Sequence, residues 1–346
     1  MVEAFCGTGD HEIYSRVRNP TVALFEDKMA ALEGAEAGAA FGSGMAAISS
    51  VLLELLEKGD KIVTVKHTYP DAYRFMKQHC HKFGVETVFV EGTDLSAIEA
   101  SLPGAKVLYL ESPSSFVMEE QDLKAIASLA RKNGVTTVID NSWATPLFQN
   151  PIELGIDMVV HSATKYISGH SDVVAGIAVG SKDLINNIKG NSTALLGGKL
   201  SAHEAGLLLR SLRTLPVRLK QHEENALFII DKMNAHPDIT KIFHPAVNTN
   251  SASMLKGYSS LLSIEVSNNI DVATFCEALQ IFYIGVSWGG YESLVLPAFA
   301  SIRRGGNYNA ALDFNLSEKW IRLFIGLEDK TDLWSDIEQA LNNAIR

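Results

Sequence analysis

The chain has 346 residues, of which 47% are hydrophobic and 20% charged, and its formal net charge at pH 7 is −10. This length is enough for two domains that each bury an apolar core. An acidic chain lacks the clustered positive charge with which proteins bind nucleic acids or anionic membranes, so neither is expected as a partner. The N-terminal residues show no secretion signal, and no apolar run approaches the length of a bilayer span, so we expect a cytoplasmic protein.

The three cysteines, Cys6, Cys80 and Cys276, lie far apart and form no C-x-x-C pair. We therefore expect neither a disulfide nor a cysteine zinc site. His79, Cys80 and His81 could in principle bind a metal, but consecutive side chains on a helix point in different directions. We interpret this cluster as solvated helix surface and expect no metal site.

The first two thirds of the chain alternate strand-like and helix-like segments. Residues 1–20 lack apolar periodicity and are expected to form an extended arm, and Thr21 is the expected cap of a helix over 22–32. Strand-like segments follow at 39–41, 61–66, 86–90, 106–111, 136–140, 158–162 and 176–180. Short apolar strands that alternate with helices predict an α/β domain with a mostly parallel sheet covered on both faces.

From about residue 215 this alternation ends. A long helical pattern over 218–233 precedes strand-like segments at 260–266, 282–288 and 320–326 and a final helix. These segments predict a smaller α+β domain. The expected organisation is therefore an N-terminal arm (1–20), a large domain (21–214) and a C-terminal α+β domain (215–346).

Polar or glycine residues follow five of the predicted strands. They are Gly42-Ser43-Gly44-Met45, His67-Thr68-Tyr69, Glu111-Ser112-Pro113, Asp140-Asn141 and Ser162-Ala163-Thr164-Lys165. Because parallel strands meet ligands at their carboxyl ends, we expect these residues to gather at one site. A phosphate-bearing aromatic cofactor would use all five segments.

Lys165 is the member of this set that most needs a partner, since an ammonium beside a buried strand is rarely left unpaired. The hydroxyls of Ser162 and Thr164 flank it and can donate to phosphate oxygens, or else cap the following segment. We interpret Lys165 as a lysine that anchors a phosphate-bearing cofactor, with a surface lysine as the alternative.

The turn Gly42-Ser43-Gly44, with Ala47 behind it, matches the dinucleotide pattern G-x-G-x-x-A, which is a weak signal on its own. A dinucleotide site would need an acidic residue at the end of the next strand, where this chain has Lys66. Amides at a helix N-terminus that hold a phosphate explain the turn more simply. A tight turn without a ligand is the other alternative.

Two charged residues in apolar strands call for partners of opposite charge. Asp140 ends its strand, where it would be paired by a protonated pyridine nitrogen and would make that ring a better electron sink. Capping of the segment from Asn141 onward is the alternative. Arg322 demands an anion, which is either a ligand or a structural carboxylate.

Eight strings, in chain order, resemble the Cys/Met-metabolism group of pyridoxal-phosphate (PLP) enzymes, which includes the cystathionine lyases, cystathionine γ-synthase and methionine γ-lyase. They are YSRVRNPT, FGSGMAAI, ESPSS, IDNSWATP, SATKYISGHSDVVAG, LRTLPVRLKQH, SWGGYESL and IRLFIGLED. The resemblance runs from Tyr14 to the C-terminus. It implies PLP as the cofactor, the type I fold of PLP-dependent transferases with a seven-stranded sheet, and a homotetramer built of catalytic dimers.

The same resemblance implies roles around the cofactor. Lys165 would form the covalent imine with PLP and act as the catalytic base, Asp140 would pair with the ring nitrogen, and Tyr69 would stack on the ring and share in catalysis. The phosphate would be held by Gly44, Met45, Ser162 and Thr164, joined by Tyr14 and Arg16 from the arm of the neighbouring subunit.

The substrate, a small sulfur amino acid, would be held by Arg322 at its α-carboxylate with help from Ser287, Trp288 and Glu111. Within the family, Trp288 and Ser115 lean toward the bacterial cystathionine β-lyase branch. The expected activity is therefore β-elimination of L-cystathionine to homocysteine, pyruvate and ammonia, a lyase step of trans-sulfuration in methionine biosynthesis.

Several alternatives remain beside this activity. A γ-acting relative, namely cystathionine γ-lyase, cystathionine γ-synthase or O-acetylhomoserine sulfhydrylase, is the closest of them. Tyr69-Pro70-Asp71-Ala72 stands where the family usually has Y-G-G-T or Y-G-C-T, which counts against methionine γ-lyase. A nicotinamide oxidoreductase built on the Gly42 turn and a non-catalytic PLP-binding homologue are more distant alternatives.

Overall fold

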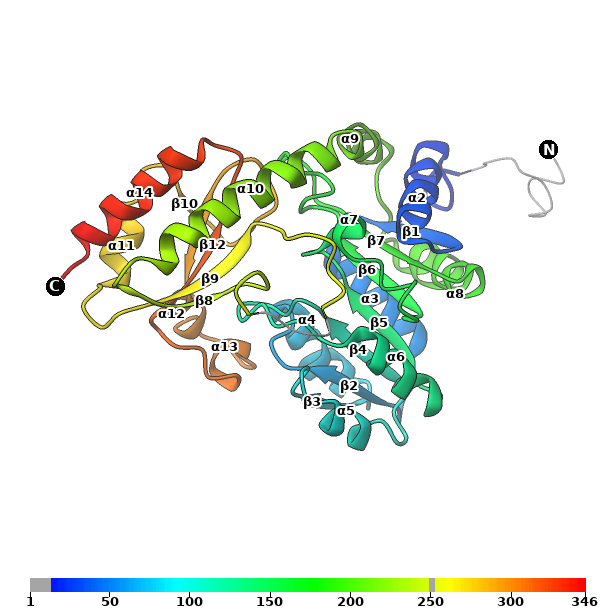
Figure 1. Cartoon of the computed structure of the whole chain (residues 1–346). Coiled ribbons are helices and arrows are strands. Elements are labelled where there is room, and N and C mark those ends of the chain that lie inside the picture. Colours follow the sequence, from blue (N-terminus) through cyan, green and yellow to red (C-terminus); the bar gives the residue numbers. More distant parts are fainter. Residues whose placement is uncertain (1–13, 249–252) are drawn as a thin grey trace, which may run out of the picture.

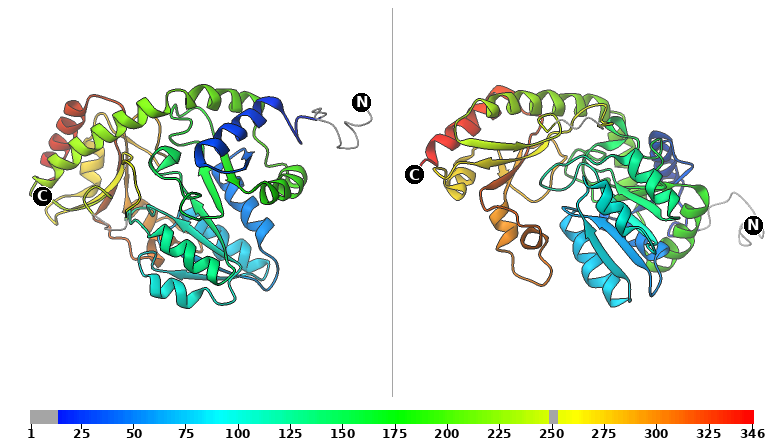
Figure 2. Two further views of the ribbon diagram at one scale, coloured as in Figure 1. Left: turned by 45° about the vertical axis from the view of Figure 1, so that its right-hand side comes forward. Right: turned by 60° about the horizontal axis from the view of Figure 1, so that its bottom comes forward.

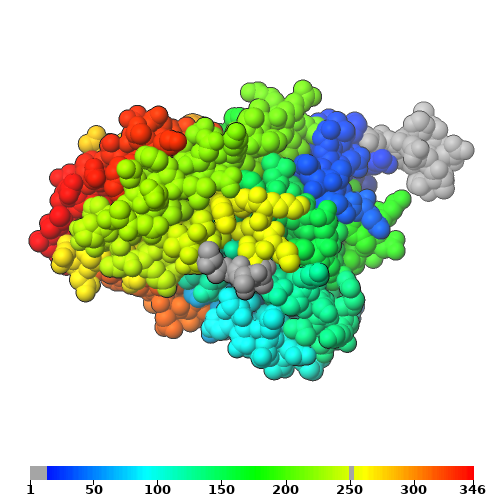
Figure 3. All heavy atoms as spheres, in the orientation of Figure 1, coloured from blue at the N-terminus to red at the C-terminus, as the bar shows by residue number. Residues whose placement is uncertain are grey.

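The computed structural model describes residues 14–248 and 253–346, which form two domains lying side by side (Figure 1). Helix α10 (Leu215–Asn234) leads from the first domain into the second and runs along one side of the molecule in both views of Figure 2. In the space-filling view, the yellow segment that follows residue 252 lies against the large domain (Figure 3). No helix in the described part of the chain is long and apolar enough to cross a membrane.

A seven-stranded sheet with the order β1-β7-β6-β5-β4-β2-β3 forms the centre of the first domain. Its strands are β1 (Ala37–Phe41), β2 (Lys61–Val65), β3 (Glu86–Val90), β4 (Val107–Glu111), β5 (Thr136–Asp140), β6 (Met158–Ser162) and β7 (Gly176–Gly180). β7 is antiparallel to both of its neighbours, and the pairs between β2 and β3, β2 and β4, β4 and β5, and β5 and β6 are parallel. The predicted mostly parallel sheet is confirmed. Each of its strands begins and ends within two residues of the predicted position.

Helices cover this sheet on both faces (Figure 1). They are α2 (Pro20–Glu33), α3 (Gly44–Leu55), α4 (Pro70–Arg74), the π-helix η1 (Phe75–Cys80), α5 (Leu95–Ser101), α6 (Leu123–Lys132), α7 (Thr145–Phe148), α8 (Lys182–Ile188), the π-helix η2 (Lys189–Leu196) and α9 (Ala202–Leu212).

Two predictions about these helices were wrong. Asn19 caps α2 in place of Thr21: its Oδ1 accepts a hydrogen bond from the Thr21 amide at 3.0 Å, and Pro20 fits the first turn because an amide there would have no helical partner. Cys80 is buried, whereas we expected solvated surface, because its side of η1 packs into the apolar core.

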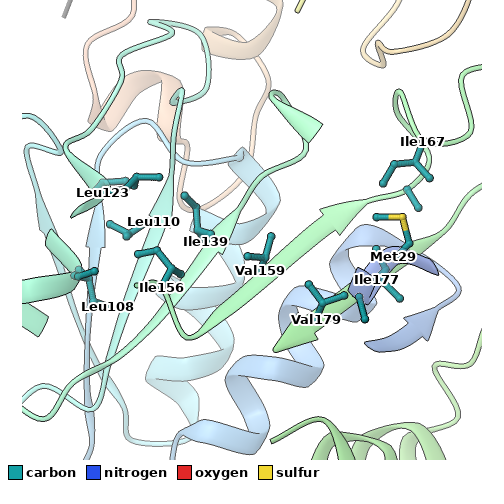
Figure 4. Packing of buried hydrophobic residues seen from close by; sticks show 14 of the residues in the cluster. Met29, Leu108, Leu110, Leu123, Ile139, Ile156, Val159, Ile167, Ile177 and Val179 are labelled. Atoms are coloured by element: carbon teal, nitrogen blue, oxygen red, sulfur yellow. The ribbon is translucent and has the colours of Figure 1, made fainter. Parts of the chain in front are cut away.

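The core of this domain lies in two layers, because successive side chains of a strand point to opposite faces of the sheet. In β4, Leu108 and Leu110 join one apolar cluster and Val107 and Tyr109 join the other. Figure 4 shows the first cluster, where β-strand side chains such as Ile139 meet helical and loop residues. Each fully buried aliphatic side chain contributes about 1.5–3 kcal/mol, so this alternation stabilises the sheet that carries the site.

The second domain contains a five-stranded sheet with the order β10-β11-β12-β9-β8. Its strands are β8 (Ile239–Phe243), β9 (Leu261–Val266), β10 (Tyr283–Ile284), β11 (Leu294–Pro297) and β12 (Trp320–Phe324). Its helices, besides α10, are α11 (Val272–Ala278), α12 (Ala298–Ile302), α13 (Ala310–Asp313) and α14 (Lys330–Asn343).

The predicted strand over 282–288 is wrong beyond Ile284, because the chain leaves the sheet there. The carbonyl of Val286 accepts a hydrogen bond from Arg322 Nη2 at 2.8 Å, and the Ser287 hydroxyl accepts one from Lys165 Nζ at 2.8 Å. Gly289 then adopts φ +86°, which a strand does not allow. These contacts turn residues 286–289 toward the large domain.

Candidate active site

A cavity of about 290 Å³ opens at the carboxyl ends of the parallel strands, between the two domains. The large domain contributes strand ends and the loops that follow them, and the second domain contributes β12, the start of β9 and the 286–288 segment. The polar residues in its wall are Ser43, Tyr69, Glu111, Ser114, Ser115, Asp140, Ser142, Ser162, Thr164, Lys165, Ser287 and Arg322. All five predicted strand ends therefore reach one site, as the parallel sheet required.

The Gly42–Gly44 turn packs directly against the end of β6. A Cβ on Gly44 would lie 2.8 Å from both Cβ and Oγ of Ser162, so only glycine brings the start of α3 this close. The Ser43 hydroxyl caps α3 by accepting from the Ala46 amide at 3.0 Å. The turn thus presents the first amides of a helix beside the Ser162 hydroxyl, an arrangement that suits an anion.

Lys165 lies in the turn after β6 and points across the cavity to the other domain. Its Nζ donates to Ser287 Oγ at 2.8 Å and lies 5.2 Å from the centre of a Trp288 ring. Burial, with a further contribution from the charge of Arg322, lowers the pKa of Lys165 to about 8, while Asp140 opposes the change. A lysine with this pKa is neutral often enough near neutral pH to bond a carbonyl carbon or to accept a proton.

The hydroxyl of Thr164 makes two hydrogen bonds to the backbone. It donates to the carbonyl of Ala175 at 3.2 Å and accepts from the Ala175 amide at 3.0 Å. Both bonds hold the lysine turn against the segment before β7. Thr164 also lines the cavity beside Ser162, and its role toward a phosphate remains a prediction.

Two carboxyl groups lie on the floor of the cavity at the ends of β4 and β5. Asp140 is buried, and its Oδ1 accepts a hydrogen bond from the Ser142 amide at 2.9 Å; burial raises its pKa, and the Ser142 bonds and nearby positive charge oppose this. Burial also raises the pKa of Glu111 well above its usual range, and Asp140 adds to this. Glu111 accepts from the Tyr69 amide at 2.6 Å, so it holds the tyrosine segment in place.

Arg322 is a partly buried cation on β12 that lines the cavity. Its Nη2 donates to the Val286 carbonyl, burial lowers its pKa to about 10, and Tyr69 opposes that change. Within residues 14–248 and 253–346 no ion pair to Arg322 forms. The structural-carboxylate alternative therefore has no partner in that part of the chain, and an anion in the cavity would supply the missing charge.

Three residues that the motif reading did not single out shape this site. Ser142 bridges two strand ends, since its amide binds Asp140 and its hydroxyl accepts from the Ser162 amide at 2.7 Å. Arg218 of α10 donates to the carbonyl of Tyr166 at 2.7 Å and so fixes the lysine turn. A Cβ on Gly289 would lie 2.7 Å from the Lys165 backbone. All three lie in strings that carry the family resemblance, IDNSWATP, LRTLPVRLKQH and SWGGYESL, but their contacts depend on tertiary structure.

Tyr14 and Arg16 lie outside the wall of this cavity. Tyr14 is exposed, Arg16 lies over its ring at 5.1 Å, and an Arg16 guanidinium nitrogen donates to the carbonyl of Ala194. Their reach into a neighbouring subunit remains a prediction. The predicted arm falls mostly on residues 1–13, which lie outside the described part of the chain.

Comparison with known proteins identifies the family. A family model described as Cys/Met metabolism PLP-dependent enzyme matches residues 2–342. The chain belongs to this family of PLP-dependent enzymes. An L-methionine gamma-lyase of Pseudomonas putida is 38% identical over 345 residues, covering 97% of this chain and 87% of that protein. A cystathionine beta-lyase of Bacillus subtilis (strain 168) is 35% identical over 342 residues, covering 95% and 85%.

Solved structures of this PLP-dependent family confirm the fold. The crystal structure of cystathionine gamma-lyase from Lactobacillus plantarum matches with a TM-score of 0.90 and 34% sequence identity, covering 98% of this chain and 90% of that one. The chain therefore has the type I fold of PLP-dependent enzymes, and its cofactor is PLP. The nicotinamide alternative for the Gly42 turn is thereby wrong.

The comparisons do not confirm the cystathionine β-lyase prediction. A β-lyase is among the relatives. The Pseudomonas putida relative and the Lactobacillus plantarum structure, however, are both named as γ-acting enzymes. They support the γ-acting alternative better than the reading based on Trp288 and Ser115.

Proposed function

We propose that this chain is a PLP-dependent carbon–sulfur lyase that cleaves the γ-carbon–sulfur bond of L-cystathionine, giving cysteine, 2-oxobutyrate and ammonia with the uptake of one water. The observation that carries this proposal is that one cavity holds Lys165, Asp140 and a partly buried Arg322 that forms no ion pair within the described part of the chain. A primary amine, a buried carboxylate and a guanidinium are the groups that PLP and an amino-acid substrate need together.

The residues present fit PLP. The Gly44 turn leaves room that a Cβ would fill, and it places helix amides beside Ser162, which suits the phosphate. Lys165 would bond the aldehyde carbon, and Asp140 would pair with the ring nitrogen, which would offset the cost of its burial. When bound, PLP serves as the electron sink that makes the substrate α-proton acidic.

The residues around the cofactor site would then divide the remaining work. Arg322 would hold the substrate α-carboxylate through a bidentate pair. Lys165 would move the proton at Nζ, and the Ser287 hydroxyl, 2.8 Å away, would orient that nitrogen. γ-Cleavage also requires a proton to be taken from Cβ, and an amine whose pKa is lowered to about 8 suits repeated proton transfer near neutral pH.

A second cavity supports a substrate longer than methionine. It has a volume of about 210 Å³ and shares Tyr69, Ser115, Val286 and Arg322 with the first. Its polar wall includes Arg304 and Tyr308, among other residues. Cystathionine carries a second amino-acid group at its far end, and such a group needs polar neighbours when it leaves bulk water.

Product analysis tests this proposal. Purified PLP-loaded protein is incubated with L-cystathionine, and the keto acids and thiols are separated; we expect 2-oxobutyrate with cysteine. Pyruvate with homocysteine would instead establish the β-lyase, the second candidate, which Trp288 and Ser115 in the cavity wall favour. Consumption of an O-acyl-homoserine with a thiol, without either keto acid from cystathionine, would overturn both. Lys165→Ala is the control for contaminating lyases.

A further inference from the structure

The turn Tyr69-Pro70-Asp71-Ala72 differs from the turn usual in the family, and it lies at the wall shared by the two cavities. Tyr69 lines both cavities, while Asp71 and Arg74 line the second. Pro70 opens helix α4, whose first turn contains Asp71 and whose last residue is Arg74. A carboxylate therefore stands beside the tyrosine where a glycine or cysteine is usual.

The Asp71 carboxylate uses one oxygen for each of two partners. Its Oδ2 accepts a hydrogen bond from the Tyr69 hydroxyl at 2.9 Å, and its Oδ1 accepts one from Arg74 Nη2. A hydroxyl that donates to a carboxylate forms a stronger bond than one that donates to a neutral acceptor. Neither glycine nor cysteine could make this bridge.

We propose that Asp71 is a positioning residue for Tyr69: its carboxylate fixes the phenol at the wall of the cavity as a hydrogen-bond donor, and Arg74 fixes the carboxylate. The backbone supports the same placement, because the Tyr69 amide donates to Glu111 at 2.6 Å. The tyrosine is thus held at both ends, at its amide by the end of β4 and at its hydroxyl by α4. This inference rests on the proposed function only in that Tyr69 acts on the substrate.

The charges around the phenol give the expected direction of the effect. Burial and the carboxyl groups of Asp140 and Glu111 raise the pKa of Tyr69, whereas Arg74 and Arg322 oppose this. Replacing Asp71 by Asn removes an anion next to the phenol and leaves Arg74 without its counter-charge. Both changes favour the phenolate. Tyr69 in the variant should therefore lose its proton at a lower pH than in the wild type.

A double-mutant cycle separates this role from a merely structural one. Asp71→Asn should lower kcat/KM by about tenfold, the loss expected for one hydrogen bond to a charged group. In the Tyr69→Phe background the same change should alter kcat/KM by less than about twofold, because the bond is already absent. An equal tenfold loss in both backgrounds, or no loss in either, would overturn the proposal. Asp71→Glu, which keeps a carboxylate, should recover part of the loss.

A spectroscopic titration keeps the test independent of turnover. The ultraviolet absorbance of ionised tyrosine is followed against pH for wild type minus Tyr69→Phe, and for Asp71→Asn minus the double variant. The isolated Tyr69 transition should move to lower pH in the second pair, and an unchanged transition would contradict the bridge. If no sulfur amino acid is cleaved at all, the proposed function fails while this titration still decides the contact.

Asp332→Asn is the matched control for both measurements. Asp332, which is exposed, is also an acidic residue in the first turn of a helix, α14, but it lines neither cavity. The substitution removes the same favourable interaction with a helix N-terminus. Neither kcat/KM nor the Tyr69 transition should change in this variant, and a comparable change would show that the Asp71 effect is not local.

Discussion

His244, in the core of the second domain, makes stability depend on pH in a way that a single substitution can isolate. Its side chain is fully buried after β8, its Nε2 donates to the carbonyl of Ser259 at 2.9 Å, and its Nδ1 accepts from the Ala246 amide at 3.2 Å. A proton on Nδ1 would meet that amide hydrogen. Burial, partly opposed by the Ser259 bond, lowers the pKa of His244 to about 4.

The lowered pKa sets the sign and size of the effect. Between pH 4 and the ordinary value of 6.5, the unfolded chain binds a proton at His244 that the folded chain does not. The free energy of unfolding therefore falls as the pH falls through this window, and the group has little influence above it. Each pH unit within this window changes the free energy of unfolding by about 1.36 kcal/mol. Between pH 7 and pH 5, His244 therefore lowers the free energy of unfolding by about 2 kcal/mol.

His244→Gln, which keeps a donor near the Ser259 carbonyl but cannot titrate, tests this reasoning. Urea unfolding at pH 7, 6 and 5, with the same PLP concentration throughout, should show a smaller loss of stability for the variant, by about 2 kcal/mol at pH 5. His203→Gln, at an exposed position of α9, should keep the wild-type slope. Equal slopes for His244→Gln and wild type would refute the reasoning.

Three further substitutions test the site and its support. Gly44→Ala places a methyl 2.8 Å from the Ser162 side chain and should weaken PLP binding by about 10–100-fold in an absorbance titration, whereas Gly206→Ala, with nothing within 4 Å, should leave it unchanged. Arg322→Lys keeps the charge but loses the bidentate fork, so kcat/KM for an amino-acid substrate should fall by at least tenfold in steady-state kinetics. Trp143→Phe removes the 3.1 Å bond from Nε1 to the first residue of β9 and should cost about 1–3 kcal/mol in urea unfolding.

The sheet and the edge that carries the site could be predicted because their signals are local. A short β-prone segment that ends in a polar residue, such as TTVID ending in Asp140 or MVVHS ending in Ser162, specifies a buried strand with a polar end, and parallel strands bring such ends together. Asp140 and Lys165 could be placed at this edge for this reason, whereas Arg322, on β12 of the second sheet, could be predicted only from its charge. Each is a charged residue in an apolar setting, and it needs a partner wherever the fold puts it.

The features that could not be predicted depend on contacts between distant segments. The sequence of 282–288 is typical of a strand, yet its bonds to Arg322 and Lys165 turn it out of the sheet. The hydrogen bonds between the Thr164 hydroxyl and the Ala175 backbone likewise depend on the fold, which brings the two residues together. The choice between β- and γ-cleavage is of the same kind, because it depends on where Lys165 Nζ lies relative to the substrate carbons.

The residue next to the lysine explains how two domains can share one site. Tyr166 is fully buried in an apolar cluster that joins the domains. Its hydroxyl accepts a hydrogen bond from the Ser260 amide at 3.0 Å, and the centre of its ring lies 5.6 Å from the centre of a Trp288 ring. The lysine turn is therefore fixed by the second domain as well as by the sheet. Substitutions in the 286–288 segment can alter how a substrate is held above Lys165 while the bonds that fix Asp140 and Ser162 stay intact. Differences in bond specificity within the family are accordingly expected to depend on this segment, together with the tyrosine turn at 69–72, rather than on the sheet.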